Sequence, residues 1–318
     1  MGRGRPRDEA SESRIARVPA TTAALVVDSR CILGEGIVWA PSRRALLWTD
    51  IQRSMLWMHS LATNVTQTWT LPDRLGSLVV CESGRLLLGL AKGLYFADID
   101  SAKGTDLPVT AVVKVEPQAP KLRVNDGRTD RSGNYVFGTM NEHEPGGPAG
   151  GFYQYSTRRG LRRLNLDPIS IANSICFSLD GRTMYHCDSP TGRIMQGDYD
   201  ADSAHVSNVR EFVRLGPAGG LPDGSVIDAA GYLWNAAWGV GLIRRCAPDG
   251  TLEREIAVPA KNPTCVAFGG DDLDRLFITS SRQEMSDEEL ERVPHAGGVY
   301  AALPGGIRGV PEPLFRGA

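Results

Sequence analysis

A short pattern that recurs six times along the chain constrains its fold more than any other feature. Each copy contains an apolar stretch, a polar turn that often includes Asp and Gly, and a second apolar run, as in FSLDGRTMY at 177–185. Equivalent apolar positions are separated by 41, 48, 49, 48 and 44 residues and fall at Leu47, Leu88, Val136, Tyr185, Leu233 and Phe277. This spacing is the length of a four-stranded antiparallel blade with its turns. The sequence therefore predicts an all-β fold, a six-bladed β-propeller.

The two ends of the repeat predict how the ring closes. Little chain follows the last strand-like run at 299–301, whereas the apolar segment 23–27 precedes the first copy and has no partner within it. We expect this N-terminal strand to complete the last blade, which leaves the ring without open edges. The segment 286–292 begins with Ser followed by acidic residues, which predicts a short helix within the sixth blade.

The first 20 residues differ from the rest of the chain. They hold five Arg and almost no apolar cluster, so they lack the apolar core of a secretory signal peptide. We expect residues 1–20 to form a flexible tail and residues 21–318 to form a single propeller domain.

Composition excludes several classes of function. The formal net charge is −2, which favours neither a nucleic-acid nor a membrane partner. No apolar run approaches the about 18 residues that a membrane-spanning helix needs. The six Cys are scattered without a CxxC pair, and several lie in apolar runs. Reduced core cysteines in a cytoplasmic protein are the expected arrangement.

Four isolated polar residues share one phase of the repeat. Glu35, Asn125, Asn173 and Asp223 lie 12, 11, 12 and 10 residues before the apolar positions of their copies, and small or turn-forming residues flank each of them. In a propeller this phase corresponds to one end of the innermost strands, near the central axis. Any one of them alone is readily explained as a turn or surface residue, and Pro222-Asp223-Gly224 is a common turn sequence. Their shared phase instead predicts that they converge.

Converging carboxylates and amides indicate a cation between them. Two carboxylates would repel one another without a positive partner, and hard divalent ions prefer oxygen ligands. All-oxygen ligation admits Ca²⁺, Mg²⁺, Mn²⁺, Zn²⁺ or Fe²⁺. The five His lack zinc-site spacing, and the chain lacks a Gly-x-Ser-x-Gly elbow. Most Trp residues fit core strand positions, and Trp238, just before Gly239, is the candidate for a pocket rim.

The chain resembles the regucalcin/gluconolactonase family of six-bladed propellers, also called the senescence-marker-protein family. The resemblance covers nearly everything after about residue 25, and its motifs are LGEG at 33–36, RVNDG at 123–127 with GTM at 138–140, NS at 173–174, and LPDG at 221–224 with GYLW at 231–234. Within the family, the segments around Cys176 and His186 look most similar to bacterial aldonolactonases.

The resemblance implies roles for individual residues. Glu35, Asn173 and Asp223 match the positions that bind one divalent metal ion in the family. Arg123 and Asn125 match the positions that hold substrate hydroxyls. Some members have a substrate-binding Glu where this chain has His143, so His143 is a candidate substrate contact here.

The expected function is the metal-dependent hydrolysis of a sugar-acid lactone, of gluconolactonase or pentonolactonase type, to the aldonate. Asp223 is the candidate general base, and the metal would polarise the lactone carbonyl. One alternative is a promiscuous arylesterase or phosphotriesterase that uses the same metal. Another is a calcium-binding or scaffolding propeller with a structural ion, although such an ion does not require the adjacent Arg123 and Asn125 pair.

Overall fold

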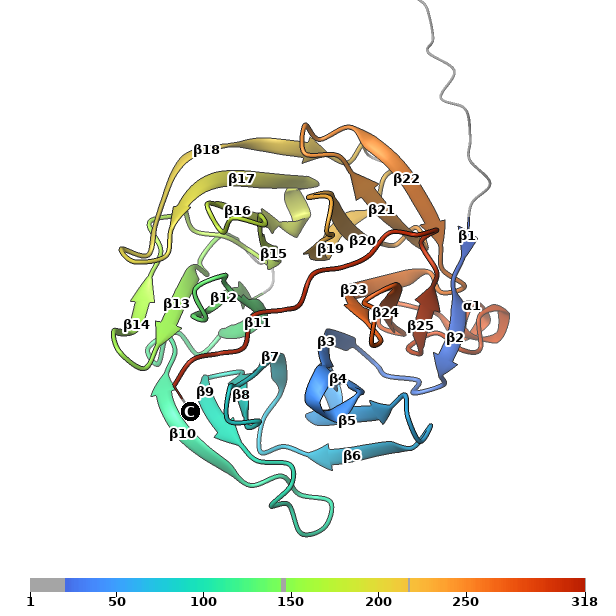
Figure 1. Cartoon of the computed structure of the whole chain (residues 1–318), viewed down its shortest axis with the longest axis horizontal. Helices are drawn as coiled ribbons and strands as arrows, with labels where there is room; N and C mark the ends of the chain where they lie inside the picture. The colour runs from blue at the N-terminus through green and yellow to red at the C-terminus, as the bar shows by residue number, and fades with distance from the viewer. Residues whose placement is uncertain (1–20, 144–146, 217, 318) are drawn as a thin grey trace, which may run out of the picture.

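The computed structural model describes residues 21–143, 147–216 and 218–317. Six antiparallel sheets stand like blades around a central axis, and their innermost strands follow one another in sequence order (Figure 1). This arrangement confirms the predicted six-bladed β-propeller. The tail predicted for residues 1–20 lies outside the described residues.

Each blade takes consecutive strands from the axis outward. Blade 1 comprises β3 (Gly34–Ala40), β4 (Ala45–Asp50), β5 (Met55–Ser60) and β6 (Thr66–Thr70). Blade 2 comprises β7 (Leu75–Val80), β8 (Leu86–Leu90), β9 (Gly93–Ala97) and β10 (Val109–Lys114). Blade 3 comprises β11 (Leu122–Thr129), β12 (Tyr135–Asn141), β13 (Phe152–Ser156) and β14 (Gly160–Arg163).

The second half of the chain repeats this order. Blade 4 comprises β15 (Ala172–Phe177), β16 (Thr183–Asp188), β17 (Arg193–Asp200) and β18 (His205–Arg214). Blade 5 comprises β19 (Leu221–Ile227), β20 (Leu233–Trp238), β21 (Leu242–Cys246) and β22 (Leu252–Ala257). Blade 6 begins with β23 (Asn262–Gly269), β24 (Arg275–Ser281) and β25 (Val299–Ala302). Short 3₁₀ turns follow β3, β4 and β16 at Pro41–Arg43, Ile51–Arg53 and Ser189–Thr191.

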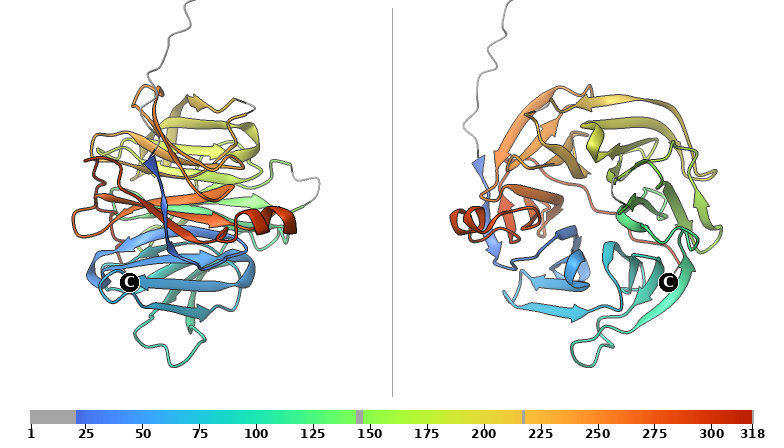
Figure 2. Two further views of the ribbon diagram at one scale, coloured as in Figure 1. Left: turned by 90° about the vertical axis from the view of Figure 1, so that its right-hand side faces the viewer. Right: turned by 180° about the vertical axis from the view of Figure 1, so that it is seen from behind.

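The N-terminal segment closes the ring. Strand β2 (Ala24–Val27) pairs antiparallel with β25 and becomes the outer strand of blade 6, as predicted. Strand β1 (Thr21–Thr22) pairs in parallel with β22, so the segment also binds blade 5 (Figure 2). The predicted helix is α1 (Asp287–Arg292), whose N-cap Ser286 forms a capping box with Glu289.

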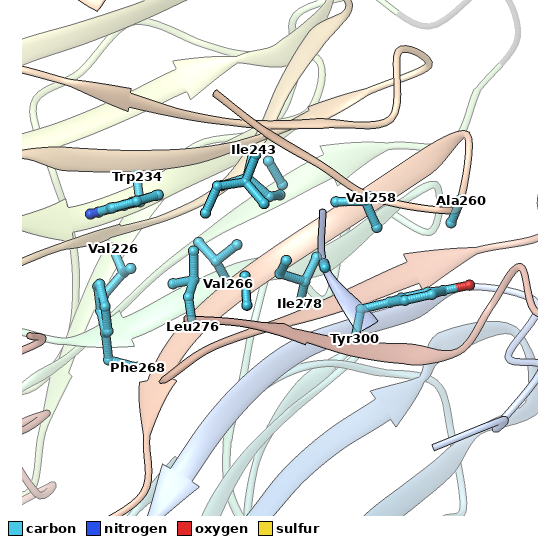
Figure 3. Close-up of a cluster of buried hydrophobic side chains, with 14 residues drawn as sticks. Val226, Trp234, Ile243, Val258, Ala260, Val266, Phe268, Leu276, Ile278 and Tyr300 are labelled. Atoms are coloured by element: carbon cyan, nitrogen blue, oxygen red, sulfur yellow. The ribbon is translucent and has the colours of Figure 1, made fainter. Parts of the chain in front are cut away.

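The hydrophobic core lies between neighbouring blades. Blades 5 and 6 share one cluster, in which Trp234 packs edge-on against Phe268 with ring centroids 6.0 Å apart (Figure 3). Trp234 is fully buried, and truncating such a side chain to Ala costs about 3–5 kcal/mol of folding free energy. All six cysteines are unpaired and buried, as expected. None of the described helices has the length and apolar character required to cross a bilayer.

A C-terminal strap, residues 303–317, crosses one end of the central channel (Figure 1). It forms isolated β-bridges from Gly309 to Asp228 in blade 5 and from Phe315 to Cys81 in blade 2. Near the middle of the strap, Glu312 forms an ion pair of 2.5 Å with the buried Arg128 of β11. The strap therefore occupies one channel end, and the predicted site residues lie at the other.

Candidate functional site

The predicted site residues other than His143 lie near the start of the innermost strands, where the pairing of each strand is irregular. All six innermost strands shift register against their neighbours at this level, for example between Glu35 and Val38 in β3 and between Asn173 and Cys176 in β15. A bulge interrupts the alternation of side chains and changes the direction in which they point. The bulges therefore allow polar side chains near the start of these strands to face the channel.

Two glycines explain the small residues that flank the acids. Gly36 has φ of +58°, a conformation that residues with a Cβ rarely adopt. A Cβ on Gly224 would lie 2.6 Å from Cys265 Sγ and 2.8 Å from Cys265 Cα in blade 6. Gly36 thus permits the backbone turn after Glu35, and Gly224 permits the close approach of blades 5 and 6 beside Asp223.

Five of the six predicted site residues line one cavity of about 150 Å³. They are Glu35, Arg123, Asn125, Asn173 and Asp223. They come from blades 1, 3, 4 and 5, which are the blades that the phase of the repeat predicted. Although they are distant in sequence, the structure brings all five together at one channel end.

Glu35 and Asp223 perturb one another in the cavity. Burial raises the pKa of Glu35 to about 8, and the nearby Asp126 carboxylate adds to this rise. Burial likewise raises the pKa of Asp223 well above its ordinary value, with Glu35 as the next cause. Both causes disfavour two negative charges in so small a space. A bound cation would remove this penalty.

The amides and the arginine form a hydrogen-bond chain around the cavity. Arg123 Nη1 donates to Asn125 Oδ1 (2.7 Å), and Asn125 Nδ2 donates to Asn173 Oδ1 (3.1 Å). Asn173 Nδ2 then donates to Ser189 Oγ (2.9 Å), whose hydroxyl donates to the carbonyl of Pro222 (2.7 Å). The chain joins blades 3, 4 and 5 and ends directly before Asp223. It fixes the orientation of each amide.

The residues present fit a divalent cation. Asp223 is 6% exposed, and its Oδ1 is buried without a hydrogen-bond partner among the described residues. The backbone carbonyl of Asp223 accepts from Ser174 Oγ (2.6 Å) and Asn235 Nδ2 (2.9 Å), which holds the residue in place. Within the described ranges, no three His, Cys, Asp or Glu side chains converge on one point. Metal ligation here would therefore need the amide oxygen of Asn173 beside the two carboxylates, and this oxygen has a second lone pair available.

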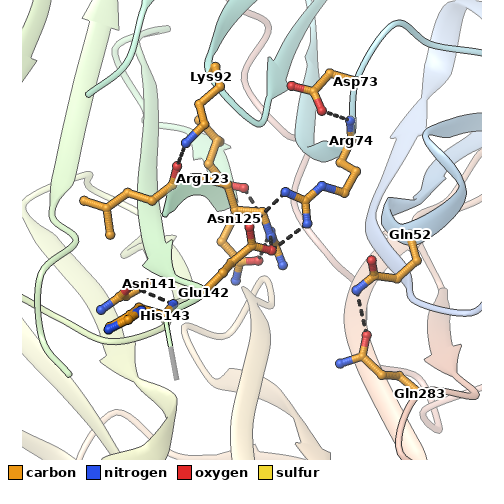
Figure 4. Close-up of polar contacts among 12 residues, drawn as sticks. Gln52, Asp73, Arg74, Lys92, Arg123, Asn125, Asn141, Glu142, His143 and Gln283 are labelled. Atoms are coloured by element: carbon orange, nitrogen blue, oxygen red, sulfur yellow. Dashed lines mark hydrogen bonds and ion pairs between the residues drawn. The ribbon is translucent and has the colours of Figure 1, made fainter. Parts of the chain in front are cut away.

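His143 lies elsewhere. It is exposed after the end of β12, it is not among the cavity-lining residues, and its backbone N–H donates to Asn141 Oδ1 (2.9 Å; Figure 4). The adjacent Glu142 instead forms ion pairs with Arg123 and with Arg74. The substrate contact suggested for His143 thus stays a prediction that the cavity geometry does not support.

Sequence reasoning missed several residues of the wall and its support. Ser189, Gln283 and Glu284 line the cavity, and Trp238 lines it as the predicted rim candidate. At this channel end, Gln283 accepts a hydrogen bond from Gln52 (2.9 Å; Figure 4). Glu142 could have been considered from the sequence, because it is one of the two acids next to the candidate His143. Nothing in the sequence distinguishes Arg74 from other surface arginines.

Three relatives resemble the chain over most of its length. An L-arabinolactonase of Azospirillum brasilense is 43% identical and aligns over 89% of this chain and 92% of its own. A 6-deoxy-6-sulfogluconolactonase of Pseudomonas putida is 34% identical over 93% and 99% of the two chains. The crystal structure of a calcium-binding protein, regucalcin, from Agrobacterium tumefaciens superimposes with a TM-score of 0.86, with 31% identity over 93% and 98% of the two chains.

The family model described as SMP-30/Gluconolactonase/LRE-like region matches residues 33–282. The matched region extends from the residues just before Glu35 to β24 and its neighbour Arg282, so it includes every residue placed in the cavity except Gln283 and Glu284. The chain therefore belongs to the SMP-30/gluconolactonase family.

Proposed function

We propose that this protein hydrolyses the ester bond of a sugar-acid lactone and releases the open-chain aldonate. The observation that carries the proposal is the arrangement of the cavity of about 150 Å³. Asp223 Oδ1, which has no hydrogen-bond partner in the described part of the chain, shares this cavity with the Arg123 and Asn125 pair. Two relatives named as lactonases support the same chemistry.

The chain's own groups would divide the work as follows. Asp223 is positioned to take a proton from a water molecule as the water oxygen forms a bond to the lactone carbonyl carbon. When the bond from that carbon to the ring oxygen breaks, the same proton can pass to the departing alkoxide. Arg123 and Asn125 offer N–H and amide groups for the ring hydroxyls, and a guanidinium suits adjacent oxygens.

A divalent ion would be held by Glu35, Asn173 and Asp223. When bound, it would supply Lewis-acid polarisation of the lactone carbonyl and balance the two carboxylates. The oxygen ligands admit Ca²⁺, Mg²⁺, Mn²⁺, Zn²⁺ or Fe²⁺.

The size of the cavity favours a small substrate. Pockets for drug-sized ligands measure about 300–1,000 Å³, so a cavity of about 150 Å³ suits a single sugar ring better than an aryl ester or a phosphotriester. The relatives are named for arabinolactone and sulfogluconolactone, which are lactones of a five-carbon and a six-carbon sugar acid. We include lactones of both chain lengths in the proposal. The buried, unpaired cysteines also suit a reducing compartment such as the cytoplasm.

The test is a substrate panel on metal-stripped protein with each ion restored in turn. Pentonolactones and hexonolactones are assayed beside an aryl ester and a phosphotriester, and kcat/KM decides between them. We expect the lactones to exceed the other substrates and activity to require an added ion. Hydrolysis of aryl esters alone would favour an esterase. Stabilisation by Ca²⁺ with no hydrolysis would favour a calcium-binding propeller with a structural ion.

A further inference from the structure

Arg123 belongs to an ion-pair cluster that lies beside the cavity. Glu142 Oε1 accepts from Arg123 Nε (3.0 Å), and its two oxygens accept from Arg74 Nη1 (2.6 Å) and Nη2 (2.8 Å) (Figure 4). Arg123 is 4% exposed, whereas Glu142 and Arg74 are 28% and 30% exposed. One carboxylate therefore connects a buried arginine of the cavity to an outer arginine from another blade.

Both outer members of this cluster have fixed backbones. Arg74 directly precedes β7 of blade 2, and its carbonyl accepts from the N–H of Ala91 (2.8 Å). Glu142 directly follows β12 of blade 3, and its N–H donates to the carbonyl of Lys121 (2.9 Å). The cluster thus spans the boundary between two blades with both ends anchored.

The contacts of Arg123 leave one edge of its guanidinium for the cavity. Nε is bound to Glu142, and Nη1 donates to Asn125 Oδ1 (2.7 Å) and to the carbonyl of Val124 (3.0 Å). For Nη2, the described part of the chain provides no hydrogen-bond partner. Because a guanidinium is planar, contacts at Nε and Nη1 fix the direction of Nη2 as well.

The two neighbouring arginines favour the ionised form of Glu142. Partial burial acts to raise its pKa, but the hydrogen bonds and charges of Arg74 and Arg123 outweigh burial and hold the pKa below its ordinary value. Without Arg74, Glu142 would lose two of its three recorded hydrogen bonds and would be free to turn toward solvent. The direction of the Arg123 side chain would then be less restricted.

We propose that Arg74 and Glu142 are positioning residues that orient the free edge of Arg123 toward the bound lactone. The inference rests on the proposed function, because it concerns the same cavity. Arg74 itself is not among the residues that line the cavity, so its influence passes through Glu142 and Arg123.

The predicted effect appears mainly in KM. Contacts from Arg123 to ring hydroxyls, which do not react, are made in the ground state and in the transition state alike. We expect Arg74→Gln to lower kcat/KM for L-arabinonolactone by about tenfold, largely as a rise in KM, because a misplaced binding group loses orientation. The pH dependence of kcat should not move, since no proton is transferred by this cluster. Arg74→Lys retains the charge but not the two-pronged contact, and should lie between Arg74→Gln and the unsubstituted protein.

The chain supplies a matched control. Arg43 forms a similar two-pronged pair with Asp100 (2.6 Å for both bonds), and this pair likewise spans a blade boundary, here between blades 1 and 2. Arg43 follows β3, so its pair lies at the strap end of the channel. Arg43→Gln should leave kcat/KM unchanged. Equal melting temperatures for Arg43→Gln and Arg74→Gln would show that the catalytic difference does not come from stability.

A double-mutant cycle with Arg123→Met tests whether Arg74 acts on the substrate through Arg123. If Arg74 acts through Arg123, then Arg74→Gln changes kcat/KM by less than about twofold once Arg123 is already replaced. Calorimetric binding of L-arabinonolactone to Asp223→Asn protein gives the same comparison without turnover. An equal loss in both Arg123 backgrounds, or no loss in either, would overturn the positioning role while lactonase activity stands. Absence of lactone hydrolysis in the unsubstituted protein would overturn the proposed function and this inference together.

Discussion

The inner strand of blade 5 has a buried aspartate toward each end, and the two differ in their partners. Asp228, just after β19, accepts from the backbone N–H groups of Ala230 (2.9 Å) and Tyr232 (3.0 Å), from Trp234 Nε1 (3.0 Å) and from Arg245 (Nε, 2.8 Å; Nη2, 2.7 Å). Asp223, near the start of β19, has an Oδ1 atom with no such partner in the described ranges.

This difference indicates that one aspartate of the strand contributes to stability and the other to function. A buried carboxylate with a full set of donors contributes to folding, and removing it leaves those donors unsatisfied. A buried carboxylate oxygen without a hydrogen-bond partner lowers stability, and a ligand that binds it would explain why it persists. Asp228 belongs to the first kind, and we assign Asp223 to the second.

The largest expected effect is on turnover, at Asp223. Asp223→Asn should lower kcat by about 10³-fold, the typical contribution of a general base, without lowering the melting temperature of metal-free protein. The chain repeats Pro-Asp-Gly at 248–250, where the exposed Asp249 caps a turn. Asp249→Asn is therefore the control and should retain activity. Full activity of Asp223→Asn would remove Asp223 from the role of base.

At Asp228 we expect a loss of stability without a loss of turnover. Asp228→Asn leaves Arg245, whose side chain is 7% exposed, with only the partly exposed Glu253 as counter-charge, and should lower the free energy of unfolding by about 3 kcal/mol. The kcat of the folded fraction should not change. Urea titration measures the loss. The comparison is Asp271→Asn, which removes the exposed ion pair with Arg44 and should cost less than about 1 kcal/mol. A loss of activity without loss of stability at Asp228 would contradict the comparison.

Metal addition should raise stability most where the Asp223 carboxylate is intact. An ion at about 100 times its dissociation constant stabilises the folded protein by about 2.7 kcal/mol. Calorimetry of metal-stripped protein should show this rise for the unsubstituted chain and a smaller one for Asp223→Asn at the same ion concentration. Equal stabilisation of both proteins would place the ion elsewhere.

His186 provides a smaller test of what an unpartnered buried atom means. Its Nε2 is buried and has no hydrogen-bond partner among the described residues. Its ring lies edge-on to Phe152 at 5.0 Å, and burial lowers its pKa to about 4. Between pH 6.5 and 4 the unfolded chain binds a proton that the folded chain excludes, so stability falls as the pH falls. At pH 5 this loss is about 2 kcal/mol relative to neutral pH.

His186→Phe should remove this component of the pH dependence. Urea unfolding of the two proteins at pH 5 and pH 7.5 measures it, because the acids contribute equally to both. An identical pH dependence would show that His186 does not titrate in this way. Catalysis should not respond in either case, since His186 is not among the residues that line the cavity.

The ring and the five cavity residues were predictable because their signals are local and repeated. Each blade carries its own turn and apolar runs, so spacing alone indicates six copies. Glu35, Asn125, Asn173 and Asp223 occur at one phase of that repeat, and Arg123 lies two residues before Asn125.

The supporting contacts were not predictable, because they depend on how separate blades meet. Arg74 and Glu142 are 68 residues apart, and nothing in either neighbourhood indicates the other. The sequence directed attention to His143, one residue beyond Glu142. The pairing of β11 with β12 and the hydrogen bond from the Glu142 N–H to the carbonyl of Lys121 place Glu142 beside Arg123. The bulges also escaped prediction, because a shift in pairing arises between strands.

The C-terminal strap crosses the channel at the end opposite the cavity (Figure 1), where Glu312 pairs with Arg128. The residues that line the cavity, Trp238 and Gln283 among them, come from the other channel end. If the lactone and the released aldonate both bind in this one small cavity, they exclude one another there. Accumulating aldonate should then compete directly with the lactone.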